Sequence, residues 1–387
     1  MREFLARKSA FYREIDAFLC LRIFEKYKAH FAKKPIIHIV GTNGKGSTGR
    51  FLAQLLEGLN FKVGHYSSPH IFDFSERFYH AGRAASWEEL EGAHRDLAAL
   101  LGEDLESLSY FEYATFLAAI LFEGCDFIIF EAGLGGEYDA TSVFEKSLSI
   151  FTKIGRDHTQ ILGENLQQIA RTKLKVMAKM TLISGEQEGE VLALAEKIAL
   201  LKGTNLVVLG ALEEDLEREV EKYSRAFGLP LFLQHNLKLA LKSCELLGLK
   251  KESLGALKNL KALNLMGRCQ KISEKLFIDV GHNEMAARAL AQHFAGQKFR
   301  LVYNAYADKD IFAILKSLKP IVAKLALFVY EDEDRDLANE AVFGVCRALG
   351  MKCGPFEGGL EKDEKILVFG SFSLVERFLK EILSVEK

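Results

Sequence analysis

Two spacings of hydrophobic residues alternate along the chain, and they predict its elements. Short apolar runs that stop at polar or glycine-rich turns indicate buried strands, whereas apolar residues three and four apart indicate amphipathic helices. The clearest pair is an apolar run at 36–40 followed by apolar residues at helical spacing from Phe51 to Leu59. Strands and helices continue to alternate in this way, which predicts an α/β fold with a mostly parallel sheet flanked by helices.

The remaining elements of the first part of the chain follow from the same two spacings. Ser86 and Glu89 form a predicted capping box at the start of a polar helix. The N-terminal segment is expected to be helical, with one apolar stripe in the core: Phe11, Ile15, Phe18, Leu21, Phe24 and Tyr27. The expected strands cover 62–66, 127–131, 148–154, 181–183 and 206–209, and the expected helices cover 87–101, 110–122 and 237–247.

The alternation then restarts after a short connector, which predicts a second domain. Its expected strands lie at 276–280, 300–303, 325–330 and 366–369. The whole chain has only five prolines and no proline-rich linker, so the restart alone sets the boundary. We therefore expect a larger α/β domain over 1–266 and a smaller, Rossmann-like α/β domain over 267–387.

Composition narrows the class of protein. The chain has 387 residues, of which 49% are hydrophobic and 27% charged, as in globular proteins with sizeable cores. Because 51 basic residues nearly balance 53 acidic ones, we expect no dominant nucleic-acid surface. No apolar run reaches the roughly 18 residues that span a bilayer, and the N-terminus does not resemble a signal peptide. The six cysteines are scattered along the sequence, which fits a cytoplasmic protein with reduced thiols. We also expect the protein to be a monomer.

A glycine-rich segment between the first strand and its helix carries the clearest chemistry. Glycines let backbone N–H groups turn toward an anion, and the helix N-terminus adds its positive dipole end. Lys45 supplies a charge for the outer phosphates, although Gly46 stands where a Ser or Thr normally follows the lysine. A glycine-rich turn that binds nothing would leave the lysine and hydroxyls unexplained. The predicted nucleotide loop comprises Gly41, Thr42, Asn43, Gly44, Lys45, Gly46, Ser47 and Thr48.

Three further polar residues follow predicted strands, and they can converge with this loop. Ser68, Glu131 and His158 each come at or just beyond a strand end, and such ends share one edge of a parallel sheet. A hydroxyl and a carboxylate suit Mg²⁺ beside ATP phosphates, although histidine is an unusual magnesium ligand. Taken singly, each could be a solvated strand end or a turn cap. Their convergence favours a metal site.

Together the motifs resemble the folylpolyglutamate synthase/dihydrofolate synthase family of the Mur ligase superfamily, over nearly the whole length. The segments that carry the resemblance are Gly41–Thr48, Tyr66–His70, Phe111–Tyr113, Glu131–Gly136 with Asp139–Thr141, Asp157–Thr159, Arg171–Lys173, His235–Asn236, Gly267–Arg268, Asp279–Asn283 and Ala307–Asp310. The resemblance implies an ATP-dependent amide ligase that joins L-glutamate to dihydropteroate or to a folate tail.

The resemblance also implies residue roles. It assigns the ATP phosphates to Lys45 and its loop, and Mg²⁺ to Ser68, Glu131 and His158. Lys173 matches a lysine that is carbamylated in relatives, whereas its neighbours Arg171 and Lys175 favour an ordinary basic helix face. The implied nucleotide contacts are Asn236, Arg268 and Asp279, and the implied substrate or cleft residues are Phe111, Glu112, Tyr138, Asp139, Ala140, His282 and Lys309.

Two departures and two alternatives remain at this point. The family usually has the sequence Arg-Leu-Asp-Ala-Thr-Asn after the double glycine. In this chain Glu137 and Tyr138 precede Asp139, where the family has Arg-Leu, and Ser142 follows Thr141, where the family has Asn. These changes fall in the predicted substrate region. Within the class, an enzyme with only one of the two activities is possible; from another class, a nucleotide-binding switch or NTPase would release phosphate without any amine.

Overall fold

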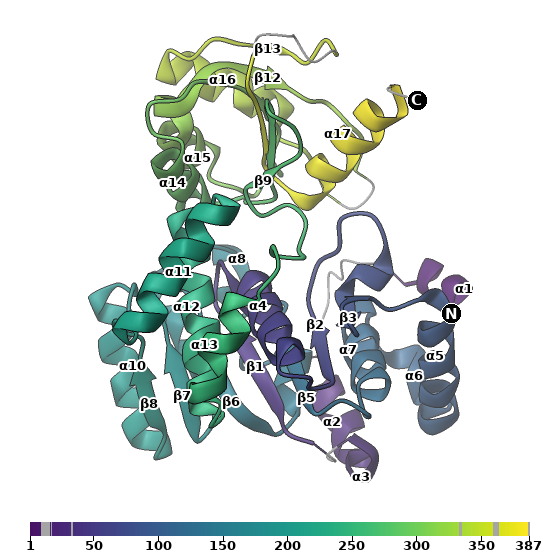
Figure 1. Cartoon of the computed structure of the whole chain (residues 1–387). Coiled ribbons are helices and arrows are strands. Elements are labelled where there is room, and N and C mark those ends of the chain that lie inside the picture. The colour runs from purple at the N-terminus through teal and green to yellow at the C-terminus, as the bar shows by residue number, and fades with distance from the viewer. Residues whose placement is uncertain (9–15, 17, 32–33, 333–334, 359–363, 386–387) are drawn as a thin grey trace. The chain divides into compact units, whose positions relative to one another are not determined.

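The computed structural model describes residues 1–8, 16, 18–31, 34–332, 335–358 and 364–385, and it shows an α/β protein. The chain divides into two compact units, 1–264 and 265–387, each built around its own sheet (Figure 1). Phe11 and Ile15, which were expected in the N-terminal stripe, lie outside the described residues. Within the described ranges, no helix has both the length and the apolar character needed to cross a membrane.

The first unit is organised by an eight-stranded sheet in the order β4-β3-β2-β5-β1-β6-β7-β8. Strands β2, β5, β1, β6, β7 and β8 are neighbours in this order and run parallel. Strands β3 and β4 extend the sheet beyond β2 as an antiparallel edge. This edge hairpin was not among the elements expected from the hydrophobic pattern. The strands are β1 (Ile36–Val40), β2 (Val63–Tyr66), β3 (Phe78–His80), β4 (Arg83–Ala84), β5 (Phe127–Glu131), β6 (Lys146–Phe151), β7 (Met180–Ile183) and β8 (Asn205–Val208).

Helices cover both faces of this sheet, as a parallel sheet requires. All five residues of β1 are buried, and the apolar side of α4 packs along α12 in the core beside it. The longer helices are α4 (Lys45–Gly58), α5 (Trp87–Leu101), α7 (Tyr110–Leu121), α9 (Leu166–Leu174), α10 (Gly189–Lys202), α11 (Glu214–Phe227), α12 (Leu231–Leu246) and α13 (Lys250–Lys258). The shorter ones are α1 (Arg2–Ala6), α2 (Leu19–Lys26), α3 (Lys28–Phe31), η1 (Phe74–Arg77), α6 (Asp104–Ser107), η2 (Ala140–Val143) and α8 (Thr159–Leu162).

Some local assignments differ from the sequence-based expectations. The helix expected over 237–247 begins six residues earlier, at Leu231, with Pro230 as its N-cap residue. The N-terminal stripe is only partly core, since the side chains of Phe18 and Leu21 are 55% and 44% exposed. The predicted capping box of Ser86 and Glu89 is confirmed at the start of α5.

The second unit contains a six-stranded sheet in the order β13-β12-β11-β14-β10-β9, in which only β9 is antiparallel. Its strands are β9 (Gln270–Lys271), β10 (Leu276–Asp279), β11 (Phe299–Tyr303), β12 (Val322–Leu327), β13 (Cys353–Pro355) and β14 (Ile366–Phe369). Its helices are α14 (Glu284–His293), α15 (Ile311–Leu318), η3 (Lys319–Ile321), α16 (Asn339–Leu349) and α17 (Phe372–Val385).

Candidate active site

The glycine-rich segment forms a tight turn between β1 and α4. A Cβ atom at Gly41 would lie 1.9 Å from Oγ1 of Thr152, so only glycine fits against the residue that follows β6. Gly44 has a φ of 90° and immediately precedes α4, which begins at Lys45. The backbone N–H of Thr42 donates to the carbonyl of Lys153, and its hydroxyl contacts Gly155. The loop is therefore fixed on one side by the segment that follows β6 and on the other by its own helix.

Asn236 reaches this loop from α12. Its Nδ2 donates to Oγ of Ser47 at 2.7 Å, and a Cβ atom at Gly44 would lie 2.6 Å from its Oδ1. Oγ1 of Thr48 is buried and has no hydrogen-bond partner among the residues that the structure describes. The loop thus holds one hydroxyl that is already oriented by an amide and another that lacks a protein partner.

Lys45, Glu131 and Ser68 meet beside the loop. Glu131 ends β5 and is only 4% exposed. Its Oε1 lies 3.7 Å from Nζ of Lys45, and its Oε2 accepts the backbone N–H of Ser68 at 3.3 Å. Glu131 offers a buried carboxylate, and Ser68, whose backbone N–H contacts that carboxylate, carries a hydroxyl; both groups are hard oxygen donors of the kind that Mg²⁺ takes in phosphate sites. These residues therefore fit a magnesium ion.

Lys173 is buried against the same loop. Its Nζ donates to the carbonyl of Gly41 at 2.9 Å, and only 5% of the residue is exposed. Burial, with the nearby charge of Lys45, lowers the pKa of Lys173 from 10.5 to about 7. Its neighbours Arg171 and Lys175 are exposed, so the interpretation of all three as one basic face was wrong for Lys173.

A loop between β5 and η2 lies next to these groups and contains the departures from the family pattern. The backbone N–H of Glu137 donates to the carbonyl of Thr172, and its carboxylate pairs with Lys175 at 2.6 Å. The hydroxyl of Ser142 donates to the carbonyl of Gly136 at 2.6 Å. Of the three residues that differ from the family pattern, Glu137 thus connects the loop to α9 and Ser142 connects two parts of the loop. The third, Tyr138, is 57% exposed.

The expected substrate residues lie around this loop, and several have structural partners. Phe111 packs so closely on Gly133 that a Cβ there would lie 2.6 Å from its ring. Asp139 is buried; its Oδ1 accepts the N–H of Thr141, and its Oδ2 accepts that of Leu134. Burial raises the pKa of Asp139 despite these bonds. Glu112 caps the start of α7 by accepting the N–H of Ser109 at 2.8 Å, and Ala140 begins η2.

His158 and the residues from the second unit stay predictions. His158 precedes α8 with a φ of 50°, and its backbone N–H donates to Asp157. In the second unit, the guanidinium of Arg268 lies 5.0 Å from the ring centre of Phe372. Asp279 is buried, with its carboxylate accepting the N–H groups of Cys269 and Gly281. His282 contacts the carbonyl of Val280, and Nζ of Lys309 lies 3.9 Å from Asp308.

Sequence reasoning missed residues that organise the site from behind. Gln187 follows β7; its Nε2 donates to the carbonyl of Thr152, and its Oε1 accepts the N–H of Ile154. Those residues flank Lys153, whose carbonyl receives the phosphate loop. Arg77 donates from Nε to Nδ1 of His70 in the turn that carries Ser68. Burial and Arg77 lower the pKa of His70 to about 4, so its ring is neutral. Neither Gln187 nor Arg77 belongs to a recognisable motif. Only their positions near strand ends could have indicated that they support the site.

Comparison with known proteins points to the family that the sequence motifs resemble. Residues 39–199 match the model of the Mur ligase middle domain. An Escherichia coli dihydrofolate synthase/folylpolyglutamate synthase is 32% identical over 313 residues, which cover 74% of this chain and 71% of that protein. The crystal structure of Helicobacter pylori folylpolyglutamate synthetase is 39% identical, covers 99% of this chain and 98% of its own, and has a TM-score of 0.80.

A third similarity is to the bifunctional enzyme of Yersinia pestis complexed with AMPPNP and Mn ion, which is 25% identical. It covers 99% of this chain and 97% of its own, with a TM-score of 0.78. These similarities extend over both units. The chain therefore belongs to the dihydrofolate synthase/folylpolyglutamate synthase family of the Mur ligases, and it is an ATP-dependent ligase.

Proposed function

We propose that this ligase joins L-glutamate to dihydropteroate and to the glutamate tail of a folate through an acyl phosphate. The observation that carries the proposal is the meeting of Lys45, Glu131, Ser68 and Lys173 at one phosphate loop. A phosphate-binding lysine beside a metal-fitting carboxylate suits phosphoryl transfer, and a ligase of this family transfers the phosphoryl group to a carboxylate.

The chemistry requires activation of the acid. A carboxylate reacts poorly with an amine because its oxygen is a bad leaving group. Transfer of the terminal phosphoryl group of ATP to that oxygen gives an acyl phosphate and ADP. The amine of glutamate then attacks the acyl carbon, an amide forms, and phosphate leaves. Phosphoryl transfer mainly needs positioning and charge neutralisation, which the loop and its lysine supply.

Each residue has a defined part in this proposal. The loop from Gly41 to Thr48 holds the phosphates, and Lys45 offsets their charge. Ser68, Glu131 and His158 hold Mg²⁺, which neutralises phosphate charge when bound. Lys173 would act as a carbamate, which turns a buried cation into an anion beside the phosphate loop. The proposed nucleotide contacts are Asn236, Arg268 and Asp279, and the proposed substrate contacts are Phe111, Glu112, Tyr138, Asp139, Ala140, His282 and Lys309.

The proposal also covers organisation and partners. Residues 1–266 form the ATP-binding domain, and residues 267–387 form the C-terminal Mur ligase-type domain. The chain acts as a cytoplasmic monomer on small molecules, without nucleic acid or membrane. The nearly balanced charge supports only the absence of a dominant nucleic-acid surface.

The test measures phosphate release by the purified protein with ATP and Mg²⁺. Dihydropteroate or tetrahydrofolate is supplied, each with and without L-glutamate. We expect release only when an acid and glutamate are present together, with ADP and an amide product in equal amounts. Release that needs neither acid nor amine would support a nucleotide switch and overturn the ligase proposal. Activity with only one of the two acids would identify a single-activity enzyme, and Lys45→Met serves as the inactive control.

A further inference from the structure

The turn that presents Ser68 is held by its own hairpin. It runs from the end of β2 to η1, and the backbone N–H of Ser67 donates to the carbonyl of Arg77 at 2.9 Å. At its far end, the carboxylate of Glu76 accepts the backbone N–H groups of Ile71, Phe72 and Asp73 at 2.8, 2.9 and 3.0 Å. One end of the turn is therefore fixed by a backbone hydrogen bond to Arg77, and the other end by the side chain of Glu76.

The middle of the turn is fixed by one side chain, that of Arg77. Its Nε donates to Nδ1 of His70 at 2.9 Å, and its guanidinium lies 5.2 Å from the ring centre of Tyr110 and 5.9 Å from that of Phe74. Arg77 is only 7% exposed. Among the described residues, no carboxylate forms an ion pair with it, so this buried cation is stabilised by rings and an imidazole.

This arrangement is costly unless the position of the turn matters. A buried charge without an opposite charge normally destabilises a fold, and an apolar residue would fill the same space at lower cost. His70 lies two residues after Ser68, whose N–H contacts Glu131. A shift of the imidazole would therefore move the Ser68 hydroxyl relative to the carboxylate.

We propose that Arg77 is a positioning residue that, through His70, holds the Ser68 hydroxyl in place for the divalent metal beside Glu131. The inference rests on the proposed role of Ser68 as a metal ligand. Residues that orient ligands from behind commonly change metal affinity by 10- to 100-fold when they are replaced. Arg77 would thus act on the metal and not on the phosphate loop itself.

The experiment compares Arg77→Met with Arg83→Met, a matched control. Arg83 lies in the same hairpin but is exposed and paired with Glu89 at 2.8 Å. Mn²⁺ binding to the protein–AMPPNP complex is followed by the EPR signal of free Mn²⁺, and metal-dependent activity is titrated in parallel. We expect Arg77→Met to weaken Mn²⁺ binding about 10-fold and to leave the KM values for ATP and the acid at saturating metal unchanged. The control should match the unmodified protein.

A double-mutant cycle separates this inference from the proposed function. If Arg77 acts through Ser68, Arg77→Met should add nothing to the metal defect of Ser68→Ala. Additive defects would overturn the positioning role, as would a raised KM for the acid with unchanged metal binding, which would mean that Arg77 binds the substrate carboxylate. A Ser68→Ala protein with normal Mn²⁺ binding would instead refute Ser68 as a ligand. Should Arg77→Met fail to fold, His70→Phe removes the same hydrogen bond and must give the same metal defect.

Discussion

At the scale of single residues, the most informative side chain is Lys173. A lysine amine reacts with carbon dioxide only in its neutral form, and burial makes that form accessible near neutral pH. The contact between its Nζ and the carbonyl of Gly41 holds it against the phosphate loop. Its position and lowered pKa therefore suit the proposed carbamate beside the phosphate loop.

Replacing Lys173 by alanine should lower activity on the order of 10- to 100-fold. The loss follows from the missing anion, so acetate, formate or bicarbonate should restore part of the rate by occupying the space. Steady-state phosphate release with and without these acids measures both effects. Arg171→Ala, on an exposed position of the same helix, is the control. Full activity in Lys173→Ala would refute the carbamate.

The pH dependence of carbamate formation gives a second prediction. Raising the pH through about 7 converts the Lys173 ammonium to the amine, because its pKa lies near 7 and not near 10.5. With dissolved ¹³CO₂ held constant, the carbamate NMR signal should therefore increase between pH 6 and pH 8, with no comparable signal from Lys173→Arg. A signal that first appears near pH 10 would contradict the lowered pKa.

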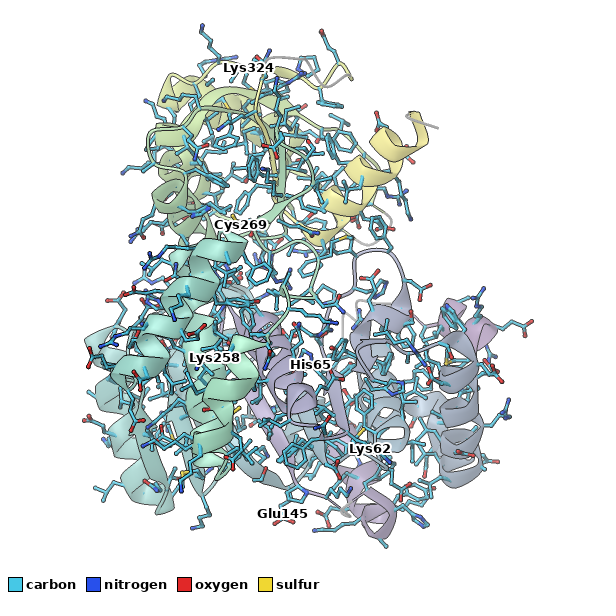
Figure 2. The ribbon with its side chains drawn as sticks, in the orientation of Figure 1. Lys62, His65, Glu145, Lys258, Cys269 and Lys324 are labelled. Atoms are coloured by element: carbon cyan, nitrogen blue, oxygen red, sulfur yellow. The ribbon has the colours of Figure 1, made fainter. Side chains whose placement is uncertain are left out.

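At the scale of elements, the contact between α4 and β2 limits what the phosphate-loop helix can contain. His65 of β2, labelled in Figure 2, is fully buried, and a Cβ atom at Gly49 of α4 would lie 2.3 Å from its Nε2. Nδ1 of the same ring accepts a hydrogen bond from Arg50 at 3.3 Å. The imidazole is thus held from two sides and cannot move away freely.

Gly49→Ala should therefore lower the free energy of unfolding by about 1–3 kcal/mol through overpacking. Urea denaturation measures this change, and His65→Val in the same protein should restore part of it. Gly255→Ala is the matched control, because Gly255 lies in α13 with open space around its Cβ position. That variant should gain stability by about 0.5–1 kcal/mol. Equal effects at the two glycines would contradict the tight packing.

The elements also show what the sequence could predict. Strands such as β1 and β5 were recognisable because burial on both faces requires a continuous apolar run. The burial of Lys173 was not, since spacing along α9 gives no information on which side meets the phosphate loop. Likewise, Asn236 and Ser47 are 189 residues apart and are joined only by tertiary packing. Local patterns predicted the loop, while the residues that position it needed the three-dimensional structure.

At the scale of the whole molecule, each of the two sheets carries polar residues at the carboxyl ends of its parallel strands. In the first unit, the phosphate loop, Ser68 and Glu131 come at the carboxyl ends of β1, β2 and β5, which are neighbours in the sheet. In the second unit, Asp279 ends β10 and receives N–H groups from Cys269 and Gly281. Each unit thus places polar groups where parallel strands end.

The proposed nucleotide contact of Arg268 tests whether the second unit takes part in ATP binding. Phe372 and the carbonyl of Gly267 contact its guanidinium within that unit. Arg268→Met should weaken AMPPNP binding by roughly 10- to 150-fold, because a charged hydrogen bond contributes about 1.5–3 kcal/mol. Isothermal titration measures the affinity directly, without turnover. Arg288→Met is the control, since Arg288 is an exposed residue of α14 paired with Glu284. Unchanged affinity in Arg268→Met would restrict nucleotide binding to the first unit.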